Sequence, residues 1–293
     1  MNLSKYFQSK AVEIDHHLDK LVPEKEVPYA LLFQAARYSL TGPGKRLRPI
    51  LVLSSTEMFG GDPKLALTPA CALEMVHTYS MIHDDLPCMD NDDFRRGKPT
   101  LHKAYPEGHA VLAGDFLLTH AFEVLAKDPN LTSEQKVALI AVLAQNAGGD
   151  GMIAGQIMDI EAEKQPIDLE KLKLIHQSKT GALITASLEF GAIIANASEE
   201  HRKILRQFGR DIGLAFQVVD DVLDVTSSEK KHGKAVASDV ANSKMTYVSL
   251  LGLEQAQATA HALLHSAQSK LDLLPYETSI LREIAKFITT RCG

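Results

Sequence analysis

The chain has 293 residues, of which 45% are hydrophobic and 23% are charged, and its formal net charge is −6. This length and apolar content suffice for a large buried core, and we expect a single domain over residues 1–293. The net negative charge does not favour a nucleic-acid partner. The three cysteines, Cys71, Cys88 and Cys292, are far apart, so neither a disulfide framework nor a zinc site is predicted.

The sequence contains no segment that predicts secretion or insertion into a membrane. Residues 1–21 lack the apolar core of a signal peptide and are typical of an amphipathic helix. The most apolar stretch, residues 181–197, is interrupted by Glu189, so no membrane span is predicted. We therefore expect a protein of the reducing cytoplasm.

Apolar residues recur at spacings of three and four along most of the chain, which is typical of α-helices. The segments with this pattern are 27–40, 65–82, 109–126, 133–147, 169–190 and 199–223. No segment alternates at period two for long enough to predict a strand. Thr132 and Ser198 are predicted helix N-caps, and Thr132 with Gln135 forms the pattern of a capping box. We predict an all-α fold, one bundle of about ten helices around a central cavity, with an inner layer buried on all sides.

Residues 81–99 place five aspartates and two adjacent arginines directly after an apolar helix. Like charges this close repel one another unless a cation lies among them. On an ideal helix Asp90 lies ~120° from Asp84, and Pro87 interrupts the hydrogen-bond ladder. We therefore predict that residues 86–89 bulge and bring Asp90 back toward Asp84.

A second acidic cluster lies in residues 216–224, "FQVVDDVLD". At ~100° per residue, Gln217, Asp220 and Asp224 share a helical face about 60° wide, and Asp221 lies ~100° from Asp220. An isolated cluster of this kind is more often a solvated acidic face. Here valine, leucine and phenylalanine surround the aspartates, so the face is predicted to point into a cavity.

Two carboxylate clusters without a histidine or cysteine ligand pattern favour Mg²⁺ or Mn²⁺, which prefer oxygen ligands. Because Mg²⁺ usually keeps waters and bridges to phosphates, a phosphorylated ligand is implied. An EF-hand is excluded because Arg95 stands where the calcium loop needs glycine, and a P-loop because Ser39 replaces its first glycine and no strand precedes it. The cations that could hold phosphates are Lys45, Arg46, Arg48, Arg95, Arg96, Lys179, Lys234 and Lys244.

Each of these cations taken alone is more often a solvated surface charge. The arginines of "GPGKRLRP" and "RRGKP" differ, because glycine and proline hold both loops in rigid turns. Bidentate contact with phosphate is therefore predicted for these two loops.

These motifs and their order resemble those of the short-chain trans-prenyl diphosphate synthases, and most closely the bacterial farnesyl diphosphate synthases. The matching motifs are "GPGKRLRP", "DDLPCMD", "RRGKPT", "GQIMD", "SKTGAL", "FQ" followed by "DDVLD", and "KMTY", and they run from Lys45 to Tyr247. Two positions depart from the family pattern: Ala237 stands where glycine is usual, and Val248 follows "TY" where proline is frequent.

The resemblance implies an isoprenoid-synthase fold, a homodimer and a prenyltransferase. Its members join dimethylallyl or geranyl diphosphate to isopentenyl diphosphate after metal-triggered ionisation of the allylic diphosphate. A farnesyl product is expected, with geranyl and geranylgeranyl diphosphate synthases as alternatives. A terpene cyclase would not need the second diphosphate site that "GKRLRP" and Arg96 indicate, and a non-catalytic subunit typically lacks one aspartate-rich motif, whereas both are present here.

The resemblance also assigns roles to individual residues. About two to three Mg²⁺ per site are expected, held by Asp84, Asp90, Asp220 and Asp224, with weaker roles for Asp85 and Asp221. Isopentenyl diphosphate is expected at Lys45, Arg48, His77 and Arg96. The allylic diphosphate is expected at Arg95, Lys179, Thr180, Gln217, Lys234 and Lys244, of which Lys179, Thr180 and Gln217 are the catalytic group.

Some assignments remain open at this stage. Without the resemblance, His77 is better explained as a hydrogen-bonded core histidine. Gln156 and Asp159, three residues apart, fit an ordinary polar helix face equally well.

Product length is expected to depend on the helix that ends at Asp84. Ideal geometry puts Ser80 ~40° and Tyr79 ~140° from Asp84, which favours Ser80 as the contact of a growing tail. The resemblance instead assigns the stop to an aromatic residue five positions before the first aspartate, which is Tyr79. A ring can reach across from an oblique face, so we expect Tyr79 to close the pocket and the product to be farnesyl diphosphate.

Overall fold

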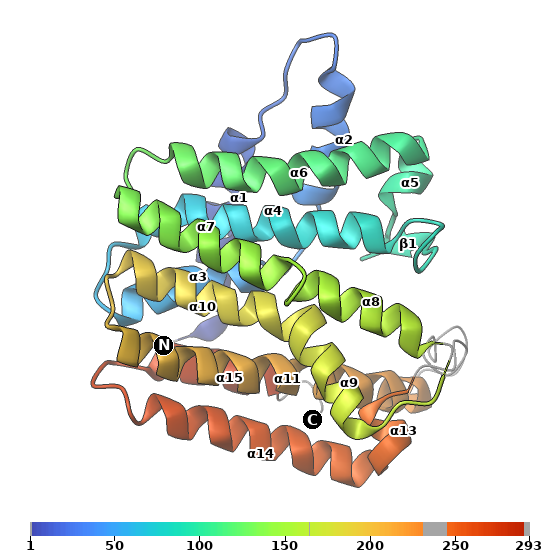
Figure 1. Cartoon of the computed structure of the whole chain (residues 1–293), viewed down its shortest axis with the longest axis vertical. Helices are drawn as coiled ribbons and strands as arrows, with labels where there is room; N and C mark the ends of the chain where they lie inside the picture. Colours follow the sequence, from blue (N-terminus) through green and yellow to red (C-terminus); the bar gives the residue numbers. More distant parts are fainter. Residues whose placement is uncertain (1, 164, 231–244, 290–293) are drawn as a thin grey trace. The chain divides into compact units, whose positions relative to one another are not determined.

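The computed structural model describes residues 2–163, 165–230 and 245–289, and over these residues helices dominate (Figure 1). The all-α class is therefore confirmed. The chain divides into two compact units. The N-terminal unit is Met1–Ala141 with Ile193–Ala195, and the C-terminal unit is Val142–Ala192 with Asn196–Gly293. A single domain over the whole chain stays a prediction.

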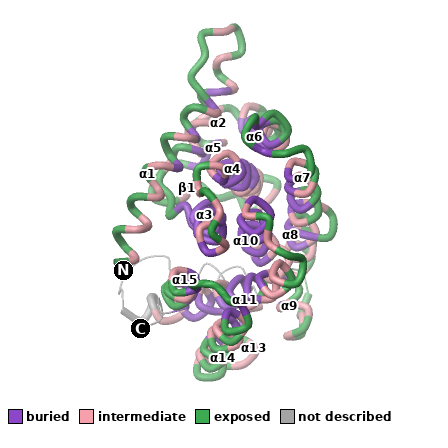
Figure 2. The backbone as a smooth tube through the Cα atoms, turned by 90° about the vertical axis from the view of Figure 1, so that its left-hand side faces the viewer, coloured by how far each residue is buried: buried purple, intermediate pink, exposed green. Residues whose placement is uncertain are grey.

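The N-terminal unit is organised around α4, whose side chains are almost all buried from Pro69 to Tyr79 (Figure 2). Helix α6 packs along α4, and α1, α2 and α3 also contact it. The elements of this unit are α1 (Leu3–Leu21), α2 (Ala30–Leu40), α3 (Leu47–Met58), η1 (Pro63–Ala66), α4 (Leu67–Asp84), β1 (Phe94–Arg95), β2 (Lys98–Pro99), α5 (Leu101–Ala104) and α6 (Glu107–Lys127). The buried α4 matches the predicted inner layer.

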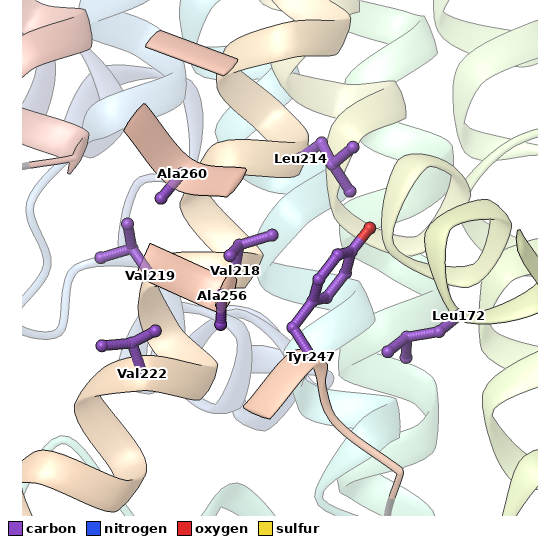
Figure 3. Close-up of a cluster of buried hydrophobic side chains, with 8 residues drawn as sticks. All are labelled: Leu172, Leu214, Val218, Val219, Val222, Tyr247, Ala256 and Ala260. Carbon is purple, nitrogen blue, oxygen red and sulfur yellow. The ribbon is translucent and has the colours of Figure 1, made fainter. Parts of the chain in front are cut away.

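The C-terminal unit is built on α11, which packs against α14 over most of its length. Its elements are α8 (Met152–Ala162), α9 (Leu169–His176), η2 (Gln177–Gly181), α10 (Ala182–Ile194), α11 (Glu199–Lys230), α13 (Tyr247–Leu251), α14 (Leu253–Leu271) and α15 (Ser279–Thr289), while α7 (Ser133–Ala147) begins in the other unit. A buried cluster that includes Val218, Val222, Tyr247 and Ala256 joins α11 to α13 and α14 (Figure 3). This cluster fixes the helix that carries the second acidic motif.

Both predicted N-caps are confirmed. Thr132 Oγ1 accepts a hydrogen bond from the Gln135 backbone N–H at 3.2 Å, and Gln135 Oε1 accepts one from the Thr132 N–H at 3.1 Å. Ser198 Oγ accepts from the His201 N–H at 3.3 Å, so Ser198 caps α11. These caps are local features, which is why the sequence alone predicts them.

Replacing Thr132 with alanine is expected to lower the free energy of unfolding by about 0.5–2 kcal/mol, because the variant loses one side of the capping box. Urea denaturation measures the change. Replacing the half-buried Thr259, whose hydroxyl donates to the Gln255 carbonyl within the same helix, is the control. A larger loss in the Thr259→Ala variant would contradict the capping role.

A two-stranded hairpin is the exception to the prediction of no strands. Phe94 pairs with Pro99 and Arg95 with Lys98. The turn residues Arg96 and Gly97 both have positive φ, 53° and 78°, as a two-residue hairpin turn requires. Strands of two residues are too short for an alternating pattern, so the periodicity analysis could not detect them.

Two helical segments are long and apolar enough to cross a membrane by length and composition, Glu107–Lys127 and Ser133–Ala162. The sequence analysis did not single them out as possible spans. Core helices meet the same criteria, and α6 packs against α4 and α2 in its own unit. Packing of this kind is typical of a core helix.

Candidate active site

The end of α4 adopts the bulge that the sequence predicts. The helix ends at Asp84, and the Asp90 backbone N–H donates to the Asp84 carbonyl at 2.9 Å. The intervening residues form turns in which Asn91 N–H bonds to the Leu86 carbonyl at 3.1 Å. The backbone therefore returns Asp90 to the end of the helix, and Asp90 is exposed there.

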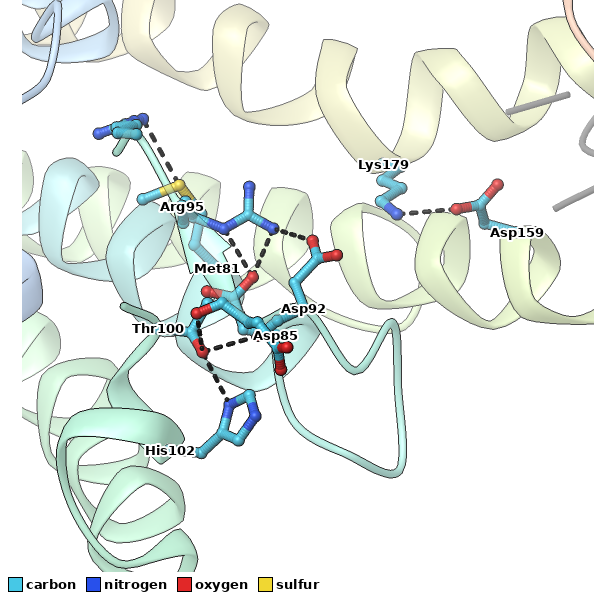
Figure 4. A network of polar contacts seen from close by, with 10 residues as sticks. Met81, Asp85, Asp92, Arg95, Thr100, His102, Asp159 and Lys179 are labelled. Carbon is cyan, nitrogen blue, oxygen red and sulfur yellow. Dashed lines mark hydrogen bonds and ion pairs between the residues drawn. The ribbon is translucent and has the colours of Figure 1, made fainter. Parts of the chain in front are cut away.

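The aspartates of this motif differ in their surroundings. Asp85 is buried and accepts a hydrogen bond from Arg95 Nε at 2.6 Å (Figure 4). Burial raises the pKa of Asp85, and the Arg95 guanidinium opposes that shift. Asp93 is exposed and pairs with Lys103 Nζ at 2.8 Å. The ion pair with Asp85 orients Arg95, and metal binding by Asp84 and Asp90 stays a prediction.

The two arginine loops meet within the N-terminal unit. Arg96 Nη1 donates to the Pro43 carbonyl at 3.1 Å. A Cβ at Gly44 would lie 2.7 Å from Arg96 Nη1, so a side chain at this position would displace the Arg96 guanidinium. The "GPGKR" loop and the hairpin turn therefore form one surface, with Lys45 exposed beside Gly44.

Arg48 and His77 belong to the same positively charged cluster. Arg48 Nε is buried and has no hydrogen-bond partner among the described residues. Burial lowers the pKa of Arg48 to about 10, Glu74 opposes the shift and Arg96 adds to it. Burial also lowers the pKa of His77 well below its usual range, and the positive charge of Arg48 lowers it further. A polyanion is the ligand that would balance this cluster.

Arg46 has a structural role, and it lies between Lys45 and Arg48, the two residues of its loop that are predicted to bind the diphosphate. Its side chain is buried and donates to Asp15 Oδ1 at 2.7 Å, to Glu74 Oε1 at 3.0 Å and to the Gly42 carbonyl at 3.0 Å. Its backbone is left-handed, with φ of 49°. These bonds attach the loop to α1 and α4, which positions Lys45 and Arg48.

In the C-terminal unit, predicted site residues lie around a π-helical turn. The helix predicted over residues 169–190 is present and contains a π-helical turn, η2, between α9 and α10. A Cβ at Gly155 would lie 2.1 Å from the Lys179 backbone nitrogen, and one at Gly213 would lie 2.7 Å from the Gly181 Cα. Two glycines on neighbouring helices thus accommodate a wider turn, and π turns of this kind are frequent at functional sites.

The side chains around η2 form two polar contacts. Lys179 Nζ pairs with Asp159 Oδ2 at 2.7 Å (Figure 4). Thr180 Oγ1 donates to Gln217 Oε1 at 2.8 Å, and Gln217 Nε2 donates to Asp220 Oδ2 at 3.4 Å. Asp159, for which the sequence left a polar surface role open, is therefore the partner of Lys179. This role of Asp159 is visible only in the contact between α8 and η2.

A cavity of about 310 Å³ in the C-terminal unit is lined by residues of η2 and of the second acidic cluster, including Lys179, Gln217, Asp220 and Asp224. The prediction that this face of α11 points into a cavity is confirmed. Asp221 also lines the cavity, but its Oδ2 accepts the Tyr247 backbone N–H at 2.8 Å and so holds the start of α13. Metal binding by Asp221 would compete with this bond.

The donor set fits Mg²⁺ that is shared with a substrate. Among the residues that the structure describes, no group of three or more His, Cys, Asp or Glu side chains is arranged to hold a metal ion. Mg²⁺ is usually bound by one or two carboxylates together with phosphate oxygens of the substrate. The carboxylates can come from Asp84 with Asp90 and from Asp220 with Asp224.

The structure describes some of the remaining predicted residues and not others. Tyr79 is 5% exposed, and Ser80 Oγ donates to the His77 carbonyl at 2.8 Å. Lys234, Lys244 and Ala237 lie outside the described residues. Val248 packs against the buried cluster of α11, α13 and α14, so this departure from the family pattern has a packing role.

Comparisons with known proteins agree with the motifs. The family model for polyprenyl synthetase matches residues 29–274. Farnesyl diphosphate synthase of Haemophilus influenzae is 43% identical over 99% of both chains. Geranylgeranyl pyrophosphate synthase of Capsicum annuum is 46% identical over 92% of this chain and 73% of the relative.

Solved structures give the same result. An FPP/GFPP synthase from Zymomonas mobilis superimposes with a TM-score of 0.89, at 41% identity and over 99% of both chains. The resemblance inferred from the motifs is therefore confirmed by an independent comparison of fold and sequence. The chain belongs to the polyprenyl synthetase family.

Proposed function

We propose that the protein condenses isopentenyl diphosphate with dimethylallyl and then geranyl diphosphate to give farnesyl diphosphate. The observation that supports this proposal is that the chain has two different groups of side chains, each suited to a diphosphate. The carboxylates of α4 and α11 suit a metal-bound diphosphate, and the Arg48, His77 and Arg96 cluster suits a second diphosphate without metal. A reaction that joins two diphosphates needs both.

The allylic diphosphate is proposed to bind Arg95, Lys179 and the aspartates. Asp85 orients Arg95, and Asp159 orients Lys179. Mg²⁺, when bound by Asp84, Asp90, Asp220 and Asp224, supplies the Lewis acidity that neutralises the leaving diphosphate. The proposal extends to Lys234 and Lys244 on the resemblance alone.

Ionisation breaks the allylic carbon–oxygen bond and leaves a cation that needs nearby dipoles. The Gln217 amide is held by Thr180 on one side and bonds to Asp220 on the other. The register change in η2 also removes backbone carbonyls from the regular ladder. We assign cation stabilisation to these groups, because dipoles fixed by the fold need no reorganisation during the reaction.

The second substrate, isopentenyl diphosphate, is proposed to bind Lys45, Arg48, His77 and Arg96. Its double bond forms the new carbon–carbon bond with the allylic carbon. The proton lost from isopentenyl diphosphate goes to the departed diphosphate, so charge and atoms balance without a further co-reactant. His77 can donate a hydrogen bond from an imidazole N–H to a phosphate oxygen.

Chromatography of the products tests the proposal. The purified protein, with MgCl₂ and the substrates dimethylallyl and isopentenyl diphosphate, is expected to yield a fifteen-carbon diphosphate. A ten- or twenty-carbon product would retain the reaction class and change the product. A cyclic hydrocarbon would indicate a terpene cyclase, and no product would indicate a non-catalytic subunit. A homodimer stays a prediction from the resemblance, and a cytoplasmic location stays a prediction from the sequence.

Replacing Tyr79 with alanine is expected to give geranylgeranyl or longer products while the geranyl step still proceeds, because the buried ring would no longer stop the growing tail. Product chromatography measures the change. The matched control is Tyr79→Phe, since the Tyr79 hydroxyl has no hydrogen-bond partner among the described residues. An unchanged product profile in Tyr79→Ala would show that the stop lies elsewhere.

A further inference from the structure

The orientation of the Tyr79 ring depends on packing. The side chain is 5% exposed, and its buried hydroxyl makes no hydrogen bond within the part of the chain that the structure describes. A ring without a polar anchor keeps its orientation only through the groups that touch it. The neighbours of this ring therefore determine where it lies.

His83, one helical turn after Tyr79 on α4, provides such a contact. The two rings are edge to face, with centroids 5.6 Å apart and planes at 82°. His83 Nε2 lies 3.0 Å from the Val111 carbonyl oxygen on α6. A carbonyl only accepts, so Nε2 carries the proton in this bond. The imidazole is thereby fixed at one edge by α6 and presents its other surface to Tyr79.

Gly114 of α6 makes this arrangement sterically possible. A Cβ at Gly114 would lie 2.2 Å from His83 Nε2 and 2.5 Å from its Cδ2. Both atoms belong to a rigid ring, so a side chain at this position would displace the imidazole. His83 therefore lies directly against the backbone of α6, where it reaches the Val111 carbonyl.

We infer that His83 and Gly114 are positioning residues that set product length by holding the Tyr79 ring across the path of the growing tail. The inference rests on the proposed function and adds to it two residues that contact neither diphosphate in that proposal. Because Gly114 has no side chain, the imidazole of His83 can pack against α6. The imidazole in turn holds the phenol ring of Tyr79 through the edge-to-face contact. Neither residue takes part in bond making or breaking.

The first test is His83→Ala in the full-length protein, assayed with dimethylallyl and isopentenyl diphosphates. The ratio of twenty- to fifteen-carbon product is expected to rise about two- to tenfold, the size that the loss of one edge-to-face contact corresponds to. A purely structural role would lower the rate without changing this ratio. Asp115→Asn is the matched control, because Asp115 lies 3.8 Å from the same imidazole nitrogen and is 56% exposed. Its product ratio is expected to match that of the unmodified protein.

The second test uses Gly114→Ala alone and combined with His83→Ala. The single change is expected to raise the same ratio, since it displaces the imidazole. In the double variant the added methyl group meets no ring, so its ratio is expected to equal that of His83→Ala. Thermal unfolding of each variant confirms that it is folded before products are compared.

The outcomes separate this inference from the proposed function. If the unmodified protein makes no prenyl product, the proposed function is wrong. If Tyr79→Ala leaves product length unchanged, the stop is wrongly assigned. If Tyr79→Ala lengthens the product but folded His83→Ala does not, or if the effects of His83→Ala and Gly114→Ala add independently, the positioning role is overturned.

Discussion

Asp84→Ala and Asp220→Ala are each expected to lower kcat by several orders of magnitude at saturating Mg²⁺ and to leave the helical fold intact. Each change removes a carboxylate from a metal-binding cluster, and loss of the metal removes several kcal/mol of charge stabilisation from the transition state. Both side chains are half-buried and do not belong to the apolar core. Steady-state turnover and circular dichroism measure the two parts of the prediction.

Two aspartates serve as matched controls for these variants. Asp93 lies three residues after the first motif and pairs with Lys103 at the surface, and Asp272 pairs with Arg282 in the C-terminal unit. Exposed ion pairs contribute about 0–1 kcal/mol to stability, so both alanine variants should keep a near-native rate. A near-native rate in Asp84→Ala or Asp220→Ala would rule out the two-cluster model.

The second large effect is expected at the metal-free diphosphate site. Arg96→Ala or Lys45→Ala should raise KM for isopentenyl diphosphate about 10- to 150-fold, which corresponds to roughly 1.5–3 kcal/mol for a lost charged hydrogen bond. KM for the allylic substrate should change much less. Initial rates with each substrate varied in turn measure the difference.

Lys98→Ala is the control for the hairpin. Lys98 lies on the strand that follows Arg96, and its ammonium group is 6.0 Å from the centre of the Tyr38 ring. It carries the same charge on the same hairpin and is not assigned to a substrate. Equal losses for both substrates in the Arg96 and Lys45 variants would show that the two diphosphate sites are not distinct.

Local features of the chain were predictable because they depend on neighbours in sequence. Helix periodicity follows from which residues are buried, and the Thr132 cap involves residues three apart. The bulge at residues 86–89 follows from Pro87 and from the spacing of the aspartates. The motifs and their order also predicted the family, which the comparisons confirm.

Features that depend on contacts between distant segments were not predictable. The sequence does not show which cations pair with the five aspartates between residues 81 and 99, whereas the fold pairs Asp85 with Arg95 and Asp93 with Lys103. The hairpin that carries Arg95 has strands too short to give a periodic signal. The repulsion among these aspartates is therefore reduced in part by Arg95 and Lys103 of the same chain.

The sequence by itself determined the helical class, the family and the candidate diphosphate ligands, because periodicity and motif spacing are properties of the linear chain. Only the tertiary structure decided that Asp159 holds Lys179, that Gly155 and Gly213 accommodate a π turn, and that Gly114 leaves room for His83 beside Tyr79. Each of these depends on the close approach of two helices. A glycine shows in sequence only that a side chain is missing, and the packed structure shows what occupies that space.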